Sequence, residues 1–330
     1  MLKHAYLITS DNINPYYNLA LEESLFLQHQ STTIMFYLWQ NHHTVVIGKN
    51  QNAYKECNLQ QMESDHCYLA RRSTGGGAVY HDLGNLNFTF IVDAEDYDVK
   101  RQSNVIINAL ATFNITANLS GRNDIEVNNK KISGNAFLAT ENKKMQHGTL
   151  LVNIDKASLG KYLKVSATKI KAKGVASVEG RVENIAFFNP AVTIASLKKA
   201  LITAFEKEYQ LELNPYFSKL PLNDLLEKYH SYNYLYNRLP DYALVINERL
   251  SFGEVEVYAS IVNNYIMDIT IFTDALPLSF IDRLKTNLVM TYLDPIAFKQ
   301  RLTQFVFEDQ PYLDDVLYLL NKIKEENDGI

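Results

Sequence analysis

The stretch ARRSTGGGAVYHDLGNLNFTF, residues 70–90, brings an arginine pair, a triple glycine, a His-Asp pair and an aromatic-rich segment together. Arginine offers a fixed cationic fork suited to carboxylate or phosphate groups. Glycine adopts backbone angles closed to other residues and lets a ligand approach the main chain. Residues 86–92 alternate enough to predict a strand that leaves the loop. Glycines alone would favour a simple turn beside Arg71 and Arg72, but the whole stretch favours an anion-binding loop.

The common phosphate-binding motifs do not fit this loop. A P-loop ends in Gly-Lys-Ser/Thr, whereas Gly77 is followed by Ala78 and Val79. A dinucleotide fingerprint requires glycine at the position of Tyr80. The loop must therefore bind its ligand in another way.

The composition is that of a globular protein, with 330 residues, 47% hydrophobic and 21% charged. This length accommodates one large domain and one small domain. The net charge of −5 gives no general field for nucleic acid or anionic membranes. No leader-like segment and no apolar run of about 18 residues is present, so we expect a cytoplasmic protein. Cys57 and Cys67 show neither a disulfide framework nor metal-ligand spacing.

The predicted elements of the first half begin with a strand at 4–8 and a helix capped by Asn14-Pro15. The apolar stripe of that helix leaves Glu22 and Glu23 aside. The pair His42-His43 lies in a polar turn, where histidines are usually solvated. Further strands are predicted at 34–39, 44–48 and 68–71, and helices at 58–65 and 98–111.

The second half changes character after Pro240. Residues 193–209 predict an amphipathic helix, and the tyrosine-rich segment 229–242 marks a candidate domain junction. Strands are predicted at 242–248, 254–262 and 265–272, and helices start near 278, 295 and 312. We therefore expect two domains, 1–240 and 241–330.

A second polar stretch, 121–152, contains a lysine pair in a predicted hairpin. A polar turn at 121–124 leads into a strand at 125–127, and Asn128-Asn129 suits a tight turn. The return strand starts KKISGNA, and its small residues Ser133, Gly134 and Ala136 would leave room beside a lysine. The simple alternative for the lysine pair is a solvated hairpin edge.

These stretches closely resemble the motifs of lipoate–protein ligases, within the biotin/lipoate ligase superfamily. Residues 70–90 resemble the lipoate-binding loop, and GRND, KKISGNA and HGTLL match the later motifs in order and spacing. Lys131 falls on the family's catalytic lysine and Lys130 on an adjacent basic position. The stretch KIKAKGVASVEGRV, residues 169–182, resembles the adenylate-binding loop and suits a mobile segment. The resemblance is strongest over 14–182 and mainly architectural after Pro240.

The resemblance implies an α+β fold, with a mixed-sheet biotin/lipoate-ligase-like catalytic domain and a small αβ C-terminal accessory domain. It also implies that ATP activates lipoate to lipoyl-AMP, and that the lipoyl group then passes to a lysine of an acceptor protein. Lys131 would bridge the carboxylate and the α-phosphate, and Asp124 would hold Mg²⁺ with ATP. The implied ATP- and lipoate-binding residues are Arg72, Ser73, Gly75, Gly76, Gly77, Ala78, Val79, Tyr80, His81, Asn85, Asn123, Asp124, Lys131, Ser133, Gly134, Ala136, His147, Gly148, Thr149, Lys173, Ser177 and Arg181.

The implied partners are lipoate, ATP, apo lipoyl domains of 2-oxoacid dehydrogenases and the glycine-cleavage H protein. We expect a monomer that uses no tightly bound prosthetic group and binds neither nucleic acid nor membrane. One alternative is an ATP-independent octanoyl or lipoyl acyltransferase on the same fold. Such relatives use a site cysteine, and Cys57 and Cys67 lie outside the 131–151 motif region. Another alternative, a non-catalytic regulator, predicts the loss of Lys131 or Asp124, and both are present.

Overall fold

The structure of the chain is a computed structural model that describes residues 2–121, 124–164, 181–236 and 244–328. The chain forms two compact units. The first comprises Met1–Ile47, Ala53–Ser73 and Ala78–Leu235. The second comprises Gly48–Asn52, Thr74–Gly77 and Tyr236–Ile330. Among the described residues, no helix has both the length and the apolar character needed to span a bilayer.

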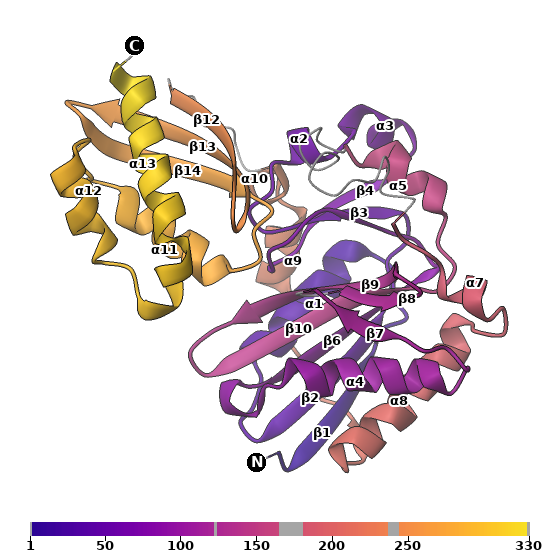
Figure 1. Cartoon of the computed structure of the whole chain (residues 1–330). Helices are drawn as coiled ribbons and strands as arrows, with labels where there is room; N and C mark the ends of the chain where they lie inside the picture. The colour runs from indigo at the N-terminus through magenta and orange to yellow at the C-terminus, as the bar shows by residue number, and fades with distance from the viewer. Residues whose placement is uncertain (1, 122–123, 165–180, 237–243, 329–330) are drawn as a thin grey trace. The chain divides into compact units, whose positions relative to one another are not determined.

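A mixed eight-stranded sheet forms the centre of the first unit (Figure 1). One strand, β1, pairs in parallel with both of its neighbours, and the other adjacent pairs are antiparallel. In sheet order the strands are β11 (Leu213–Pro215), β1 (His4–Thr9), β2 (Thr33–Trp39), β6 (Asn85–Asp93), β10 (Lys143–Leu151), β9 (Lys130–Ala139), β8 (Asp124–Val127) and β7 (Asn118–Ser120).

Every residue of β2 and β6 is buried, because helices cover both faces of this sheet. Helices α4 (Val99–Ala111) and α8 (Ile194–Tyr209) cover one face, where Phe36, Phe90 and Phe205 stack. Helix α1 (Pro15–Leu27) covers the other face. Asp98 and Thr193, the first residues of the predicted ranges, are N-caps that accept hydrogen bonds from the first turn of their helices.

Helix α1 begins as predicted, since the side chain of Asn14 accepts from the amides of Tyr16 and Tyr17. The placement of Glu22 outside the packed stripe is wrong: this side chain is only 1% exposed. The helix is buried around most of its circumference, between the large sheet and α9 (Asn223–His230). A buried carboxylate needs polar partners, and Glu22 has them in Thr89 and His147.

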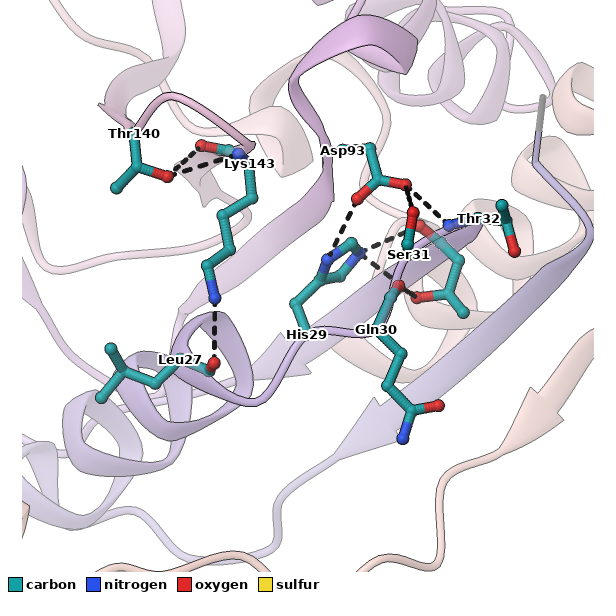
Figure 2. Close-up of polar contacts among 9 residues, drawn as sticks. Leu27, His29, Gln30, Ser31, Thr32, Asp93, Thr140 and Lys143 are labelled. Atoms are coloured by element: carbon teal, nitrogen blue, oxygen red, sulfur yellow. Dashed lines mark hydrogen bonds and ion pairs between the residues drawn. The ribbon is translucent and has the colours of Figure 1, made fainter.

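The connection from α1 to β2 is held by a polar cluster around His29 and Asp93 (Figure 2). Asp93 accepts from the Ser31 hydroxyl at 2.9 Å and from the Thr32 amide at 2.6 Å. His29 Nε2 lies 3.0 Å from the carbonyl oxygen of Thr33. The side chain of His29 is 1% exposed, although Gln28, Gln30 and Ser31 of the same connection are exposed.

A small second sheet carries the glycine-rich stretch. Its order is β4 (Tyr68–Arg71), β3 (Thr44–Ile47) and β5 (Val79–His81), with β3 parallel to β4 and antiparallel to β5. The predicted strands at 34–39 and 44–48 therefore belong to different sheets. The remaining short helices of this unit are α2 (Ala53–Glu56), α3 (Leu59–Ser64), η1 (Ala94–Asp96), α5 (Lys156–Tyr162), α7 (Ile185–Phe188) and α10 (Tyr232–Tyr236).

The second unit has its own hydrophobic core beneath an antiparallel three-stranded sheet. The strands β12 (Leu244–Leu250), β13 (Gly253–Val262) and β14 (Tyr265–Thr273) match the prediction, and Asn263-Asn264 form a left-handed tight turn. The helices are α11 (Leu278–Leu288), α12 (Pro295–Leu302), η2 (Phe307–Tyr312) and α13 (Leu313–Asp328). The predicted α+β class is confirmed.

Two short upstream segments are part of this second unit. The amide of Thr273 donates to the carbonyl of Asn50 at 2.7 Å. The Asn52 side chain donates to Glu256 at 3.1 Å. From the glycine loop, the amide of Gly76 donates to the carbonyl of Ala275 at 3.2 Å.

Candidate active site

The hairpin of β8 and β9 positions Lys131 beside a carboxylate. Its turn is made by Asn128 and Asn129, whose φ angles of 50° and 61° are left-handed, as the sequence predicted. A register shift between Ile125 and Glu126 sets Lys131 opposite Glu126, so its side chain shares a sheet face with Asp124, two positions along. Lys131 Nζ lies 2.8 Å from Asp124 Oδ1, and both side chains are partly exposed.

Gly134 makes this geometry possible, because the lysine side chain lies across it. A Cβ atom at Gly134 would lie 2.7 Å from Lys131 Nζ and 2.9 Å from its Cε. The small residue at this position therefore provides room for Lys131 itself. Ser133 is paired with Ile125, a member of the α4 and α8 core, so it lies on the opposite face of the sheet.

A row of polar positions crosses the large sheet on the face of Gly134. Trp39 pairs with Asn87, and Asn87 pairs with Thr149. The amide of Gly134 donates to Thr149 Oγ1 at 3.3 Å. On the same face of β6, the side-chain amide of Asn85 donates to the side-chain oxygen of Asn87 at 2.9 Å. Because directly opposed residues share a face, the row leads across to the lysine–carboxylate pair.

This row carries buried polar atoms that have no hydrogen-bond partner within the described residues. They are Asn85 Oδ1 and Asn87 Nδ2, and the small sheet with the segment after β4 adds His81 Nε2 and Ser73 Oγ. Buried polar groups in proteins are nearly always satisfied. The unsatisfied atoms of Asn85 and Asn87, which share one face of β6, can therefore bind a polar ligand.

Glu22 and His147 form a buried pair on the same sheet face. His147 Nδ1 lies 2.9 Å from Glu22 Oε1 and 3.0 Å from Oε2. The Thr89 hydroxyl donates to Glu22 at 2.5 Å, and the Trp39 indole donates to Thr89 at 3.1 Å. Sequence reasoning missed Glu22, Thr89 and Trp39, although an acidic residue inside the apolar run of α1 was a signal for Glu22.

Arg72 supplies a buried cation near this pair. Its guanidinium donates to the carbonyl of Val46 at 3.2 Å. Burial lowers the pKa of Arg72 to about 10, and the charge of Glu22 opposes that shift. The guanidinium therefore stays charged at neutral pH. A desolvated cation of this kind acts strongly on a carboxylate or phosphate brought beside it.

His81 is neutral and has a defined tautomer. Burial, reinforced by the positive charges of Arg72 and His147, lowers the pKa of His81 to about 3. Its Nδ1 lies 3.2 Å from Asn41 Nδ2, an amide nitrogen that can only donate. The ring proton is thus on Nε2, the buried atom without a described partner. His81 can donate one hydrogen bond to a ligand.

Arg71 has a different role from its neighbour. It donates to the carbonyls of Tyr234 and Leu235 at 2.6 and 2.5 Å, and it is 1% exposed. The expectation that both arginines serve an anion stays a prediction for Arg72, whereas Arg71 holds α10 against β4.

The glycine loop needs glycine for two reasons. Gly76 has a φ angle of 89°, which other residues rarely adopt. A Cβ at Gly75 would lie 2.5 Å from the carbonyl oxygen of Ala275, whereas one at Gly77 would meet nothing within 4 Å. The half-buried Ala78 and Val79 then lead into β5.

The described end of the predicted adenylate-binding loop touches Lys131 directly. The amide of Lys131 donates to the carbonyl of Arg181 at 3.0 Å, and the amide of Glu183 donates to the carbonyl of Lys131 at 2.9 Å. Asn123, Lys173 and Ser177 lie outside the described residues. On β10, Gly148 lies against Phe88, since a Cβ there would be 2.6 Å from that ring. Ala136 pairs with His147.

Comparison with known proteins agrees with this architecture. The family model for the lipoyl protein ligase A/B catalytic domain matches residues 14–206, and that for the bacterial lipoate protein ligase C-terminus matches residues 239–315. A curated lipoate-protein ligase A of Psychrobacter cryohalolentis is 39% identical over 305 residues, which cover 88% of this chain and 89% of that protein.

Solved structures give the same result. LipL1 of P. falciparum in complex with lipoate is 30% identical, with a TM-score of 0.86 over 96% of this chain and 99% of that chain. A bipartite lipoate protein ligase with its E2 lipoyl domain from Thermoplasma acidophilum is 28% identical, with a TM-score of 0.64 over 74% and 100%. A lipoate-protein ligase A bound with ATP is 27% identical, with a TM-score of 0.62 over 72% and 100%.

The first unit thus has the fold of a lipoyl protein ligase catalytic domain. The chain belongs to the lipoate–protein ligase family, and it carries the family's catalytic and C-terminal domains. The resemblance recognised from the sequence motifs is confirmed.

Proposed function

We propose that the protein activates lipoate with ATP to lipoyl-AMP and transfers the lipoyl group to a lysine of an acceptor lipoyl domain. A free carboxylate does not acylate an amine at neutral pH, because its oxygen is a poor leaving group. Adenylation replaces that oxygen with a good leaving group and releases pyrophosphate. The observation that carries this proposal is the Lys131 ammonium, held across Gly134 beside Asp124.

In the first step, Lys131 bridges the lipoate carboxylate and the α-phosphate as they combine. Its charge is already in place, so it stabilises the negative charge that builds in the transition state. Arg72 adds a second, buried cation, and His81 Nε2 donates a hydrogen bond to the bound acyl or phosphate oxygen. The unsatisfied amides of Asn85 and Asn87 orient the same ligand.

Mg²⁺ bound with ATP would supply positive charge to neutralise the phosphates. This ion commonly binds one or two protein carboxylates together with phosphate oxygens and water. Asp124 fits as one such carboxylate, because it is partly exposed and lies beside Lys131, the residue proposed to face the α-phosphate. The same carboxylate orients the lysine before the ligands bind.

In the second step, the acceptor lysine attacks the adenylate carbonyl, and no nucleophile of this chain takes part. The acceptors are lipoyl domains of 2-oxoacid dehydrogenases and the glycine-cleavage H protein. The E2 lipoyl domain present with the Thermoplasma acidophilum ligase supports the first of these. We further propose a cytoplasmic monomer with its domain boundary near residue 240.

The test is pyrophosphate release from Mg-ATP on addition of lipoate, followed by transfer to a purified apo lipoyl domain. We expect both steps, with mass spectrometry showing one lipoyl group added to the acceptor. Release that does not depend on lipoate, or transfer that does not require ATP, would overturn the proposal. Parallel assays with octanoate and with H protein define the substrate range.

The alternative, an ATP-independent acyltransferase, requires a reactive thiol. Burial raises the pKa of Cys57 to about 12 and that of Cys67 to about 12, so neither forms a thiolate at neutral pH. We expect a Cys57→Ala/Cys67→Ala protein to retain ligation within about twofold. Loss of acyl transfer in this protein, with its circular dichroism unchanged, would favour the alternative.

A further inference from the structure

His43 was expected to be solvated, yet it lies half-buried between two tyrosines of other elements. Its Nδ1 lies 2.8 Å from the hydroxyl of Tyr80 on β5. Its Nε2 lies 3.4 Å from the hydroxyl of Tyr162, the last residue of α5. The three rings also touch, with centroids 5.4–5.9 Å apart. The neighbouring His42 is exposed, which matches the expectation.

The donor and the acceptor of each hydrogen bond in this group can be assigned. Tyr162 donates to Asp65 at 2.7 Å, and Lys161 pairs with the same carboxylate at 2.6 Å. Hydrogen bonds from Lys161, Tyr162 and Gln61 lower the pKa of Asp65 to about 2, so it remains an acceptor. The Tyr162 oxygen can then only accept from His43 Nε2. A neutral His43 consequently accepts from Tyr80 at Nδ1.

Tyr80 matters because it fixes a very short strand. β5 has three residues and, among the described strands of its sheet, pairs only with β3. Successive side chains of a strand point to opposite faces, so Tyr80 points away from His81. Tyr80 is 3% exposed, and burial raises its pKa to about 12. Its hydroxyl therefore stays a neutral donor and anchors the strand from the side opposite the ligand.

We propose that His43 is a positioning residue for ligation. Through Tyr80 and Tyr162 it ties β5 to α5 and α3, and so holds the backbone of β5 and the His81 side chain in place for lipoate and ATP. This role rests on the proposed function of the same site. It does not place His43 in contact with either substrate.

The left-handed backbone of His43, with φ of 41°, allows a clean test. Asparagine tolerates this conformation, so His43→Asn removes the imidazole without backbone strain. Tyr80→Phe removes one oxygen and keeps the ring. His42→Asn changes the exposed neighbour in the same turn and serves as the matched control.

We expect His43→Asn and Tyr80→Phe each to raise the KM for lipoate about 5–10-fold in pyrophosphate release, the effect of one lost hydrogen bond. The value of kcat should change less than about twofold, because Lys131 is untouched. The double variant should match the more affected single variant, because both changes remove one shared interaction. His42→Asn should behave as the wild type.

Three outcomes would overturn the proposal: unchanged KM in a folded single variant, multiplicative effects in the double variant, or an equal effect of His42→Asn. If His43→Asn fails to fold, Tyr80→Phe alone still decides. Absence of lipoate-dependent pyrophosphate release in the wild type would instead contradict the proposed function, so the two failures are distinguishable.

Discussion

Lys131 is the residue on which adenylation depends. We expect Lys131→Ala to lower the rate of lipoate-dependent pyrophosphate release by about 10²–10³, the usual effect of removing one preorganised donor. Lys131→Arg should also be slow, because a planar fork does not replace a compact ammonium group. A partly exposed hairpin lysine contributes little to stability, so the melting temperature should hardly change.

The adjacent lysine is the matched control for this experiment. Lys130 is exposed and lies one position away on the same hairpin. Lys130→Ala should leave pyrophosphate release within a few-fold of the wild type. An assay of lipoyl transfer from supplied lipoyl-AMP to the acceptor measures the second step alone. Near-normal release by Lys131→Ala would remove this residue from the mechanism.

Gly134 gives a test of position rather than of charge. In Gly134→Ala the new Cβ would lie 2.7 Å from Lys131 Nζ, and the flexible end of the lysine can move away. We therefore expect an intact fold with a melting temperature close to that of the wild type, but adenylation reduced at least about tenfold. Differential scanning calorimetry and the pyrophosphate assay measure the two effects. Equal activity of wild type and variant would mean that adenylation does not depend on the position of the Lys131 ammonium across Gly134.

Residue types in the motifs predicted much of this site, but not its buried side. The sequence placed Lys131 and Asp124 in one hairpin, where local spacing decides proximity. It could not separate Arg71 from Arg72, because adjacent residues at a strand end differ only in which neighbours surround them. Glu22 was missed for a similar reason. Its burial depends on β10 and β6, which come much later in the chain.

Among the elements, the connection from α1 to β2 should make stability depend on pH (Figure 2). Burial lowers the pKa of His29, although its contact with Thr33 and the charge of Asp93 oppose the shift. The unfolded chain, with an ordinary histidine pKa near 6.5, thus binds this proton more readily than the folded one. The contribution of His29 is complete above pH 6.5 and is lost as the pH falls.

We expect the melting temperature of the wild type to fall more steeply between pH 7 and pH 5 than that of His29→Gln. His4→Gln, at an exposed position, is the control and should keep the wild-type slope. Parallel curves for the wild type and His29→Gln would show that His29 does not carry this pH dependence.

Most elements were predictable within one or two residues, because caps and turns are local signals. Asn14 caps its helix as predicted, Asp98 and Thr193 cap the helices whose predicted ranges they begin, and both Asn-Asn turns are left-handed. Strand order was not predictable from these signals. Only tertiary pairing places β3 in the small sheet while β2 joins the large one.

At the scale of the whole molecule, each unit has a separate hydrophobic core, and Gly75 lies within the second unit. In Gly75→Ala the new Cβ would lie 2.5 Å from the backbone oxygen of Ala275, which cannot move as a side-chain end can. We expect a lower unfolding temperature for the second unit and a raised KM for lipoate. Calorimetry and steady-state assays measure these effects.

Gly77→Ala is the matched control, since its Cβ would meet no atom within 4 Å. It should leave the unfolding of the second unit unchanged. If Gly75→Ala also leaves it unchanged, the loop does not pack as described.

The membership of Gly48–Asn52 and Thr74–Gly77 in the second unit has a consequence for biosynthesis. A ribosome makes these segments long before it makes Ala275 and Thr273, their hydrogen-bond partners. Domains of nascent chains generally fold from the N-terminus onward. The large sheet can thus assemble during translation, whereas the glycine loop acquires its final partners only when the C-terminal strands emerge. A chain that stops before Ala275 would contain Lys131 but lack the partners of the glycine loop, so the completed loop requires synthesis of the second unit.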